Sequence, residues 1–449
     1  MVLNRTRFMT HLEIRYPSRW PGELLAAFAR DLLEATQRLD RAGQRAGADV
    51  VHAGPAGQGI VWLRHPDLVR AVLIDENSGV TKARGLRLAQ AILGLGLLTL
   101  EEPHHAPRRR LVLPAFHHQR LRAYADVMVD QARAEAETWG SGPFDLAASM
   151  GRLALAIASQ TLFGADVDRQ RITGAVAQGQ SAFDGAQHPL GELFARLPMP
   201  STLRTRRARA AIDSEVYRVI ADRRAAGGDD GSLLDLLLAA RDDDTGAGLS
   251  DDEVRDEAVT LLLAGHETTA VALSWAWPLI ADHPEVEARL QDEADALGGP
   301  PGFDDVRRLP YARQVLAEVM RFYPPAWVIG REAARDLDLD GVAIAKGSTV
   351  LLPPLTIQRD PRFWRGPSRF DPDRFSPERK AERHKFAYFP FSAGRRGCIG
   401  EQFAWTEGVL ILATIAQRWR IRPAGPLPPP IGSVTLRPSG PVPVRAERR

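Results

Sequence analysis

Hydrophobic positions recur with helical spacing through most of the first half of the chain. From about residue 23 to residue 238 they predict mainly helices, because apolar residues return every three or four positions. Loop-forming residues interrupt this pattern at 53–59, 141–143, 198–201 and 227–230. We also expect small β-rich parts at about 50–75, 327–356 and 420–445. The predicted fold class is therefore mainly α with small β-sheets (α+β).

The most apolar stretch predicts one long helix. Ser250 followed by Glu253 matches a capping box, so a helix that begins there extends to about Asp282, roughly 30 residues or about 45 Å. His266 and Glu267 lie in the middle of its apolar part, 257–284, where a membrane would penalise a charge by several kcal/mol. A helix buried in a protein core is thus favoured over a membrane span.

Further elements follow towards the C-terminus. A helix in 306–325 must end at Pro324 and Pro325, because proline lacks the amide proton and clashes with the preceding turn. Short Val, Ile and Leu runs in 327–355, separated by "DLDG" and "AKG", predict small strands and hairpins. Helical spacing returns from Ile399 to Trp419, and a proline-rich stretch leads to a final strand pair.

Composition limits the possible classes of protein. The chain of 449 residues exceeds the usual single hydrophobic core, so two domains or one large fold around a prosthetic group are open. The net charge of +2 gives no reason to expect a nucleic-acid partner. The N-terminal sequence lacks a signal-like apolar segment. The single cysteine excludes an intrachain disulfide and fits a reducing compartment. We expect a cytoplasmic protein without a membrane span, with transient membrane-surface contact left open.

That single cysteine, Cys398, lies in "FSAGRRGCIG". A lone cysteine is most often a small buried hydrophobe. Here, however, Gly394, Gly397 and Gly400 permit close approach of a bulky group, and the helix that follows stabilises a thiolate. A thiolate is a nucleophile or a metal ligand, but no cysteine-protease signature is present. Zinc would need further Cys or His ligands, and none follows Cys398. One thiolate suits haem iron.

The same segment resembles the cytochrome P-450 family. The family signature F-x-x-G-x-R-x-C-x-G is matched by Phe391, Gly394, Arg396, Cys398 and Gly400. Other family motifs occur in the family order: "AGHETT" from Ala264 to Thr269, E-x-x-R as Glu318 and Arg321, and "PDRF" from Pro372 to Phe375. His105 with Arg109 is a weaker match. The resemblance implies a single P-450 haem domain over residues 1–449, with a long helix over haem b (iron protoporphyrin IX).

The resemblance also implies a role for each motif. Cys398 would be the axial ligand of the haem iron, with Gly400 tuning the sulfur and Phe391 packing beside the haem. Ala264 and Gly265 would leave room for dioxygen, while Glu267 and Thr268 would deliver protons. The expected partners of the haem propionates are His105, Arg109, Arg331 and Arg396, and a solvated basic face is expected for Arg108 and Arg110. Glu318, Arg321 and Arg374 would form a buried structural network.

Substrate and partners are implied less sharply. Apolar segments at 85–98 and 324–330, with a lid at 183–200, favour a large apolar substrate. Local resemblance to bacterial carotenoid hydroxylases favours ring hydroxylation of the β-carotene type, with fatty-acid or terpenoid/polyketide hydroxylation as the alternative. Electrons are expected from a separate ferredoxin or flavodoxin and its NAD(P)H-dependent reductase, which would dock on a basic face comprising Arg108, Arg110, Arg120, Arg122 and Arg395. A peroxygenase or a haem sensor remains the non-monooxygenase alternative.

Overall fold

Two compact units make up the computed structural model of the chain. The structure describes residues 11–15, 31–54, 57, 59–76, 79–164, 200–226, 231–241 and 246–449. Unit 1 comprises Met1–Arg87, Ala326–Ser368 and Glu382–Cys398, and unit 2 comprises Leu88–Pro325, Arg369–Ala381 and Ile399–Arg449. Each unit thus joins segments that are far apart in the sequence. A single haem domain over residues 1–449 stays a prediction.

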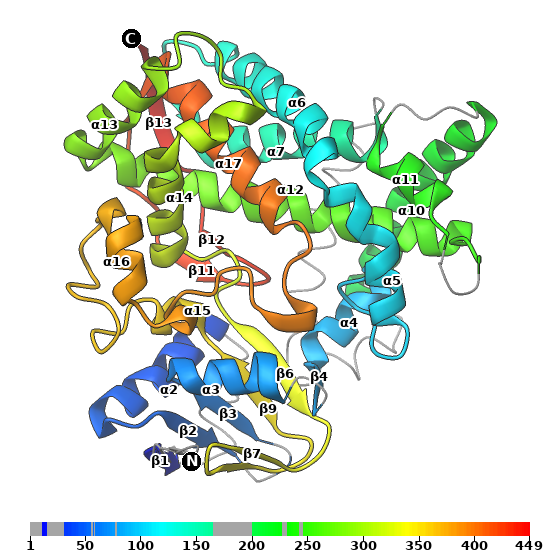
Figure 1. Cartoon of the computed structure of the whole chain (residues 1–449), viewed down its shortest axis with the longest axis vertical. Helices are drawn as coiled ribbons and strands as arrows, with labels where there is room; N and C mark the ends of the chain where they lie inside the picture. Colours follow the sequence, from blue (N-terminus) through cyan, green and yellow to red (C-terminus); the bar gives the residue numbers. More distant parts are fainter. Residues whose placement is uncertain are drawn as a thin grey trace, which may run out of the picture. The chain divides into compact units, whose positions relative to one another are not determined.

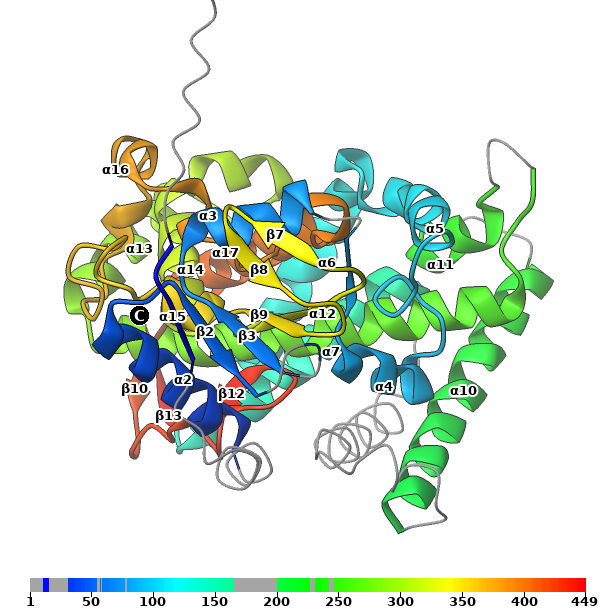
Figure 2. The same ribbon diagram turned by 90° about the horizontal axis from the view of Figure 1, so that it is seen from below.

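Unit 1 is built on a six-stranded sheet. Its strand order is β1-β2-β3-β9-β6-β4, and the strands are β1 (Glu13–Arg15), β2 (Val50–Ala53), β3 (Ile60–Leu63), β4 (Val80–Lys82), β6 (Ile329–Ala333) and β9 (Thr349–Leu352). Figure 2 shows N-terminal strands β2 and β3 beside the later strand β9. Strand β3 runs parallel to β9 with Val61 opposite Val350, and β6 runs antiparallel with Arg331 opposite Val350. The sheet therefore places Arg331 among buried aliphatic side chains.

The strands expected in 327–355 are confirmed. Besides β6 and β9, strands β7 (Leu337–Leu339) and β8 (Val342–Ile344) form a hairpin. Asp340 and Gly341 at its tip have φ of 52° and 91°, as an Asp-Gly turn of this kind requires. In the first half of the chain, β2, β3 and β4 interrupt the expected helices. The part at 50–75 holds two strands followed by helix, since the apolar spacing of 66–75 is helical.

Helices of unit 1 flank this sheet. They are α2 (Leu32–Ala46), α3 (Pro66–Arg70), η1 (Ala71–Asp75), α15 (Pro354–Ile357), η5 (Lys385–Ala387) and η6 (Gly394–Arg396), and α4 (Arg84–Leu93) contains the boundary with unit 2. Helix α2 begins where the Asp31 side chain accepts the Glu34 amide and ends at Gly47, which has a left-handed φ of 64°.

Unit 2 is mainly helical (Figure 1). Its helices are α5 (His105–Val112), η2 (Leu113–Phe116), α6 (His118–Glu137), α7 (Leu146–Phe163), α10 (Pro200–Ala226), α11 (Leu233–Ala239), α12 (Asp251–Ala281), α13 (Pro284–Asp295), η3 (Phe303–Arg308), α14 (Pro310–Phe322), η4 (Pro372–Phe375), α16 (Pro377–Glu382) and α17 (Glu401–Ala416). The long helix is confirmed as α12, because Ser250 and Glu253 form the predicted capping box at its start.

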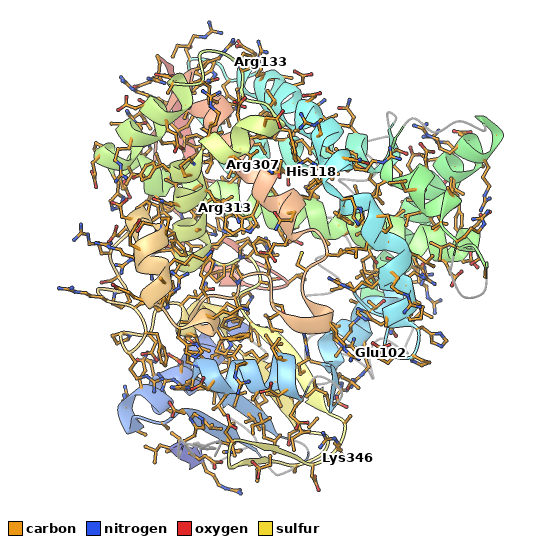
Figure 3. All side chains as sticks on the ribbon, viewed as in Figure 1. Glu102, His118, Arg133, Arg307, Arg313 and Lys346 are labelled. Atoms are coloured by element: carbon orange, nitrogen blue, oxygen red, sulfur yellow. The ribbon has the colours of Figure 1, made fainter. Side chains whose placement is uncertain are left out.

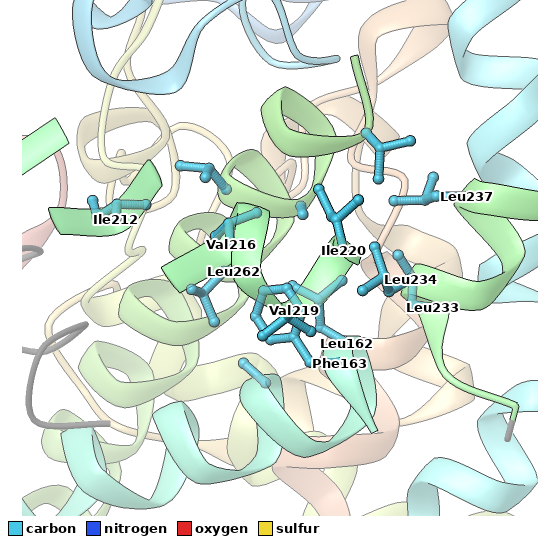
Figure 4. Packing of buried hydrophobic residues seen from close by; sticks show 14 of the residues in the cluster. Leu162, Phe163, Ile212, Val216, Val219, Ile220, Leu233, Leu234, Leu237 and Leu262 are labelled. Carbon is cyan, nitrogen blue, oxygen red and sulfur yellow. The ribbon is translucent and has the colours of Figure 1, made fainter. Parts of the chain in front are cut away.

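Helix α12 is the centre of the unit 2 core. With 31 residues it is about 46 Å long, and it packs against α7, α10, α14 and α17. Figure 4 shows one part of this core, where Leu262 of α12 lies in one cluster with Phe163 of α7, Val219 of α10 and Leu234 of α11. Among the described residues, α7 is the one helix long and apolar enough to cross a membrane. Because 72% of it is buried in the structure, α7 is explained by its place in this core.

The C-terminal strands of unit 2 form two sheets. Strands β10 (Trp419–Pro423), β13 (Pro443–Arg448) and β5 (Phe144–Asp145) make one sheet, and β11 (Pro430–Gly432) pairs with β12 (Leu436–Pro438). The expectation of one final strand pair is therefore too simple. The backbone carbonyl of Leu436 accepts the indole N–H of Trp275 at 2.8 Å, so β12 is attached directly to α12.

Candidate active site

The middle of α12 differs from the rest of the helix in its exposure. Ala264 is exposed, whereas residues before and after it, such as Leu262 and Leu273, are buried. A Cβ added to Gly265 would meet no atom within 4 Å. This open turn of a core helix is where the sequence predicts room for dioxygen, and its small residues leave open space there.

Two hydrogen bonds orient the acid and the alcohol that follow. The Thr268 hydroxyl donates to the carbonyl oxygen of Ala264 at 2.7 Å, a bond to the i−4 carbonyl that threonines within helices commonly form. The Thr435 hydroxyl donates to Glu267 Oε1 at 2.7 Å. Thr435 lies between β11 and β12, and no local motif in the sequence marks it. The carboxylate of Glu267 is thus held by a segment 168 residues further along the chain.

The next threonine contacts a second acid. The Thr269 hydroxyl donates to Glu407 Oε2 of α17 at 2.7 Å, and both side chains are buried. Burial raises the pKa of Glu407 to about 8, because one hydroxyl compensates little of the lost hydration. Nearby on α12, desolvation lowers the pKa of His266 to about 4. Neither group is charged to a large extent at neutral pH.

In unit 1, the residues before Cys398 form a tight turn. The Cys398 amide donates to the Phe391 carbonyl at 3.0 Å, and the Gly397 amide donates to the Gly394 carbonyl at 3.0 Å. Gly394 has a φ of 71°, and a Cβ there would lie 2.2 Å from the carbonyl oxygen of Leu73. Glycine is therefore required at this position. Cys398 is exposed and lies two residues before Gly400, the N-terminal cap of α17.

The basic residues expected near the propionates occur in both units. Arg331 is buried on β6 and Arg396 is half-buried at the end of η6, both in unit 1. His105 is buried and Arg109 is half-buried on α5 of unit 2, one turn apart on the same helix.

Arg108 contradicts the expectation of a solvated basic face. Its side chain is buried, and it pairs with Glu257 at 3.1 Å and with Glu253. The partners lie about 150 positions away in the sequence, so the basic run at 108–110 gave no sign of them. Arg108 is accordingly unable to belong to an exposed docking face, whereas Arg110 is exposed as predicted.

Glu318, Arg321 and Arg374 meet in unit 2. The side chains of Glu318 and Arg321 are completely buried, with Arg321 Nε donating to Glu318 Oε2 at 2.6 Å. Arg374 Nε lies 3.4 Å from Glu318 Oε1, and the Asp371 amide donates to the same oxygen at 2.8 Å. Arg321 also donates to the Arg369 carbonyl at 3.2 Å. The network thus attaches the segment 369–374 to α14.

These residues fit a haem group in their chemistry. The open turn at Ala264 and Gly265 offers space, and the exposed thiol of Cys398 offers one soft ligand of the kind that haem iron accepts. The buried and half-buried cations described above are of the kind that bind carboxylates such as the two propionates. No cluster of three or more His, Cys, Asp or Glu that could bind a metal ion directly occurs among the residues that the structure describes.

Comparison with known families decides the identity. The family model "Cytochrome P450" matches residues 36–443. The chain belongs to the cytochrome P450 family. It is accordingly a haem-dependent monooxygenase, and two relatives are named as a monooxygenase and an oxygenase.

Several relatives of this P450 come from Streptomyces species. Cyclooctatin synthase of Streptomyces melanosporofaciens is 41% identical, with 80% of each chain covered. Cyclooctat-9-en-7-ol 5-monooxygenase of the same organism is 38% identical over 80% of this chain and 79% of its own. Pentalenene oxygenase of Streptomyces avermitilis is 35% identical over 80% of each. A crystal structure of the cytochrome P450DA heme domain matches with a TM-score of 0.87 and 28% identity, covering 98% of both chains.

The predicted fold class is confirmed by this structural match. The lid expected at 183–200 lies outside the described residues except for its last position. Sequence reasoning missed three polar residues of the site: Thr269, Glu407 and Thr435. The first is part of "AGHETT", so its proximity to the site was visible, but its partner on α17 was not.

Proposed function

We propose that this P450 hydroxylates a terpenoid. The observation that supports this is the similarity, over 80% of the chain, to enzymes named for cyclooctat-9-en-7-ol and pentalenene, which are terpenoids. The predicted carotenoid substrate has no such support among these relatives, whereas the terpenoid alternative fits them. The apolar segments at 85–98 and 324–330 agree with either kind of hydrocarbon.

We assign the haem contacts by residue. Cys398 would ligate the iron, and the tight turn from Phe391 to Gly397, closed by the Cys398 and Gly397 amides, would position its sulfur. His105, Arg109, Arg331 and Arg396 would neutralise the propionates. When bound, the thiolate-ligated haem supplies activation of dioxygen and transfer of one oxygen atom to a C–H bond.

In this proposal, residues of α12 orient water and transfer protons. Thr268 orients a water molecule through its hydroxyl oxygen, because its hydrogen is donated to the Ala264 carbonyl. Glu267 exchanges a proton at Oε2, since Oε1 accepts the Thr435 hydroxyl. Ala264 and Gly265 keep side-chain atoms out of the space beside these groups.

Electrons reach the enzyme from a ferredoxin or flavodoxin in this proposal. Arg122 of α6 is exposed and bonded to Asp304 at 2.6 Å, and His118 packs on Phe303, so α6 and η3 share one surface. Figure 3 shows His118, Arg307 and Arg313 on this side of unit 2. A surface rich in cations attracts an acidic partner. Reduction should therefore slow as salt is raised, and a salt-independent rate would contradict this docking.

A cytoplasmic location remains a prediction. It is supported by the single thiol and by the burial of α7 in the core.

Incubation of the enzyme with one candidate substrate at a time tests which kind of substrate it accepts. The haem-loaded enzyme receives a ferredoxin, a reductase, NADPH and dioxygen, together with pentalenene, cyclooctat-9-en-7-ol, β-carotene or a fatty acid, and products are separated by mass. The proposal expects addition of one oxygen atom to a terpenoid. Conversion of β-carotene or the fatty acid alone would contradict it. Product formed with peroxide but not with the reductase would instead indicate a peroxygenase, and haem binding without any product a sensor.

A further inference from the structure

The loop 94–99, between α4 and α5, is attached to α12 through its backbone. The Leu95 amide donates to Asp256 Oδ2 at 2.6 Å, and the Leu97 amide donates to Glu257 Oε2 at 3.0 Å. We call these two bonds the clasp. Hydrogen bonds to charged groups are stronger than bonds between neutral groups.

Cations secure the carboxylates of the clasp. Arg108 of α5 pairs with Glu257 at 3.1 Å, and Arg255 pairs with Asp256 at 2.8 Å. Arg255 is itself buried, bonded to Asp213 of α10 and to the Ile92 carbonyl at 3.0 Å. Each carboxylate is thus held by a cation as well as by a loop amide.

The loop has the shape that this attachment needs. Gly94 has a φ of 68°, and the Thr99 hydroxyl donates to its carbonyl at 2.6 Å. A Cβ on Gly96 would lie 2.2 Å from Thr260 Oγ1 and 2.6 Å from the Asp256 carbonyl oxygen. The loop therefore contacts α12 backbone to backbone, and any side chain at Gly96 would push it away.

Two leucine side chains of the attached loop are exposed. Leu97 and Leu100 are buried, whereas Leu95 is 54% exposed and Leu98 is 40% exposed. Asp256 precedes Ala264 by about two turns of α12, or about 12 Å. A large apolar molecule beside Ala264 can span that distance and reach the loop.

We propose that Asp256 and Glu257 are positioning residues, which hold the loop 94–99 so that it bounds the space for an apolar substrate beside Ala264. The kind of substrate in this inference rests on the proposed function, whereas the existence of the clasp does not depend on it. Burial raises the pKa of Glu257 to about 7, although the Leu97 amide and Arg108 act to lower it. The test is therefore done at pH 8, where the carboxylate is mainly ionised.

Hydrogen–deuterium exchange of the full-length protein tests the clasp. In Asp256→Ala and Glu257→Ala, the amides of Leu95 and Leu97 respectively should exchange roughly tenfold faster or more, because each loses a charged acceptor. Gly96→Ala should speed exchange of both amides without removing a charge. The clasp can therefore still be tested if Glu257→Ala does not fold. The controls are Asp252→Asn, which removes a carboxylate charge of α12 that accepts from Tyr217 and from no loop amide, and Gly85→Ala, which has open space. Unchanged exchange in Asp256→Ala and Gly96→Ala would refute the clasp.

Azole binding to the haem-loaded protein tests the substrate role. Clotrimazole is large and apolar, while imidazole is small and reaches only the iron. In Asp256→Ala and Gly96→Ala, the dissociation constant of clotrimazole should rise roughly three- to tenfold, since binding must then order the loop, with imidazole unchanged. Equal effects on both ligands, or none, would overturn the role in substrate binding. A wild-type protein without a haem-thiolate spectrum would contradict the proposed function, and exchange would still decide the clasp.

Discussion

Buried carboxyl groups in unit 2 have contrasting partners. Glu318 faces the guanidinium groups of Arg321 and Arg374, which compensate its charge. Glu407 has the Thr269 hydroxyl as its bonded partner and a pKa raised to about 8. Removal of the carboxylate charge should therefore lower the stability of the protein at Glu318. At Glu407, the same change should raise stability at high pH.

Glu407→Gln should remove a pH dependence of stability. In the unfolded chain this carboxyl has a pKa near 4.5, so between pH 4.5 and about 8 the folded protein holds the extra proton. The free energy of unfolding falls as pH rises through that window, by about 1.4 kcal/mol for each pKa unit of difference. Urea unfolding of the haem-loaded protein at pH 6 and pH 9 should show a smaller loss in Glu407→Gln than in the wild type or the exposed control Glu382→Gln. An equal loss in all three would contradict the neutral acid.

Glu318→Ala should destabilise unit 2 by roughly 3–5 kcal/mol, because it leaves Arg321 buried without its carboxylate. Asp373→Ala is a matched control from the PDRF segment. Its pair with Arg289 at 2.9 Å is exposed on both sides, and such a pair contributes about 0–1 kcal/mol. Unfolding and haem content per chain measure the difference. Similar values for the two variants would show that the buried network is not structural.

At the scale of elements, α17 lies closely against α14 through one glycine. A Cβ on Gly408 would lie 2.4 Å from Leu316 Cδ2. Gly408→Ala should therefore cost about 1–3 kcal/mol by overpacking. Gly151→Ala in α7 meets no atom within 4 Å, so its helix propensity should raise stability by up to about 1 kcal/mol. Thermal unfolding of both variants measures the contrast, and destabilisation by neither would contradict the tight packing of α14 and α17.

Elements with local signals were predictable from the sequence. The start of α12 at Ser250 and the end of α14 before Pro324 depend on capping and on proline, which act within a few residues. The strands β2 and β3 were less clear, since each has four residues and its partners come from elsewhere in the chain. Arg108 was misjudged because its buried partners lie on α12, and no nearby residue indicates them.

At the scale of the whole molecule, motifs in the sequence predicted the chemistry of the protein, but they did not predict which side chains are in contact. The order of "AGHETT", E-x-x-R, PDRF and the cysteine signature was enough to indicate the family that the matched model then confirmed. The partners of Glu267 and Thr269 depend on folding of segments from 138 to 168 residues away, and their identities required the structure.

The carbon monoxide difference spectrum of the reduced protein tests the thiolate ligand most directly. The wild type, expressed with haem, should show the absorption band for which the cytochromes P450 are named, and Cys398→Ser should lose it while retaining the helical content of the fold. A wild-type spectrum typical of a histidine-ligated haem, or persistence of the band in Cys398→Ser, would contradict the assignment of Cys398.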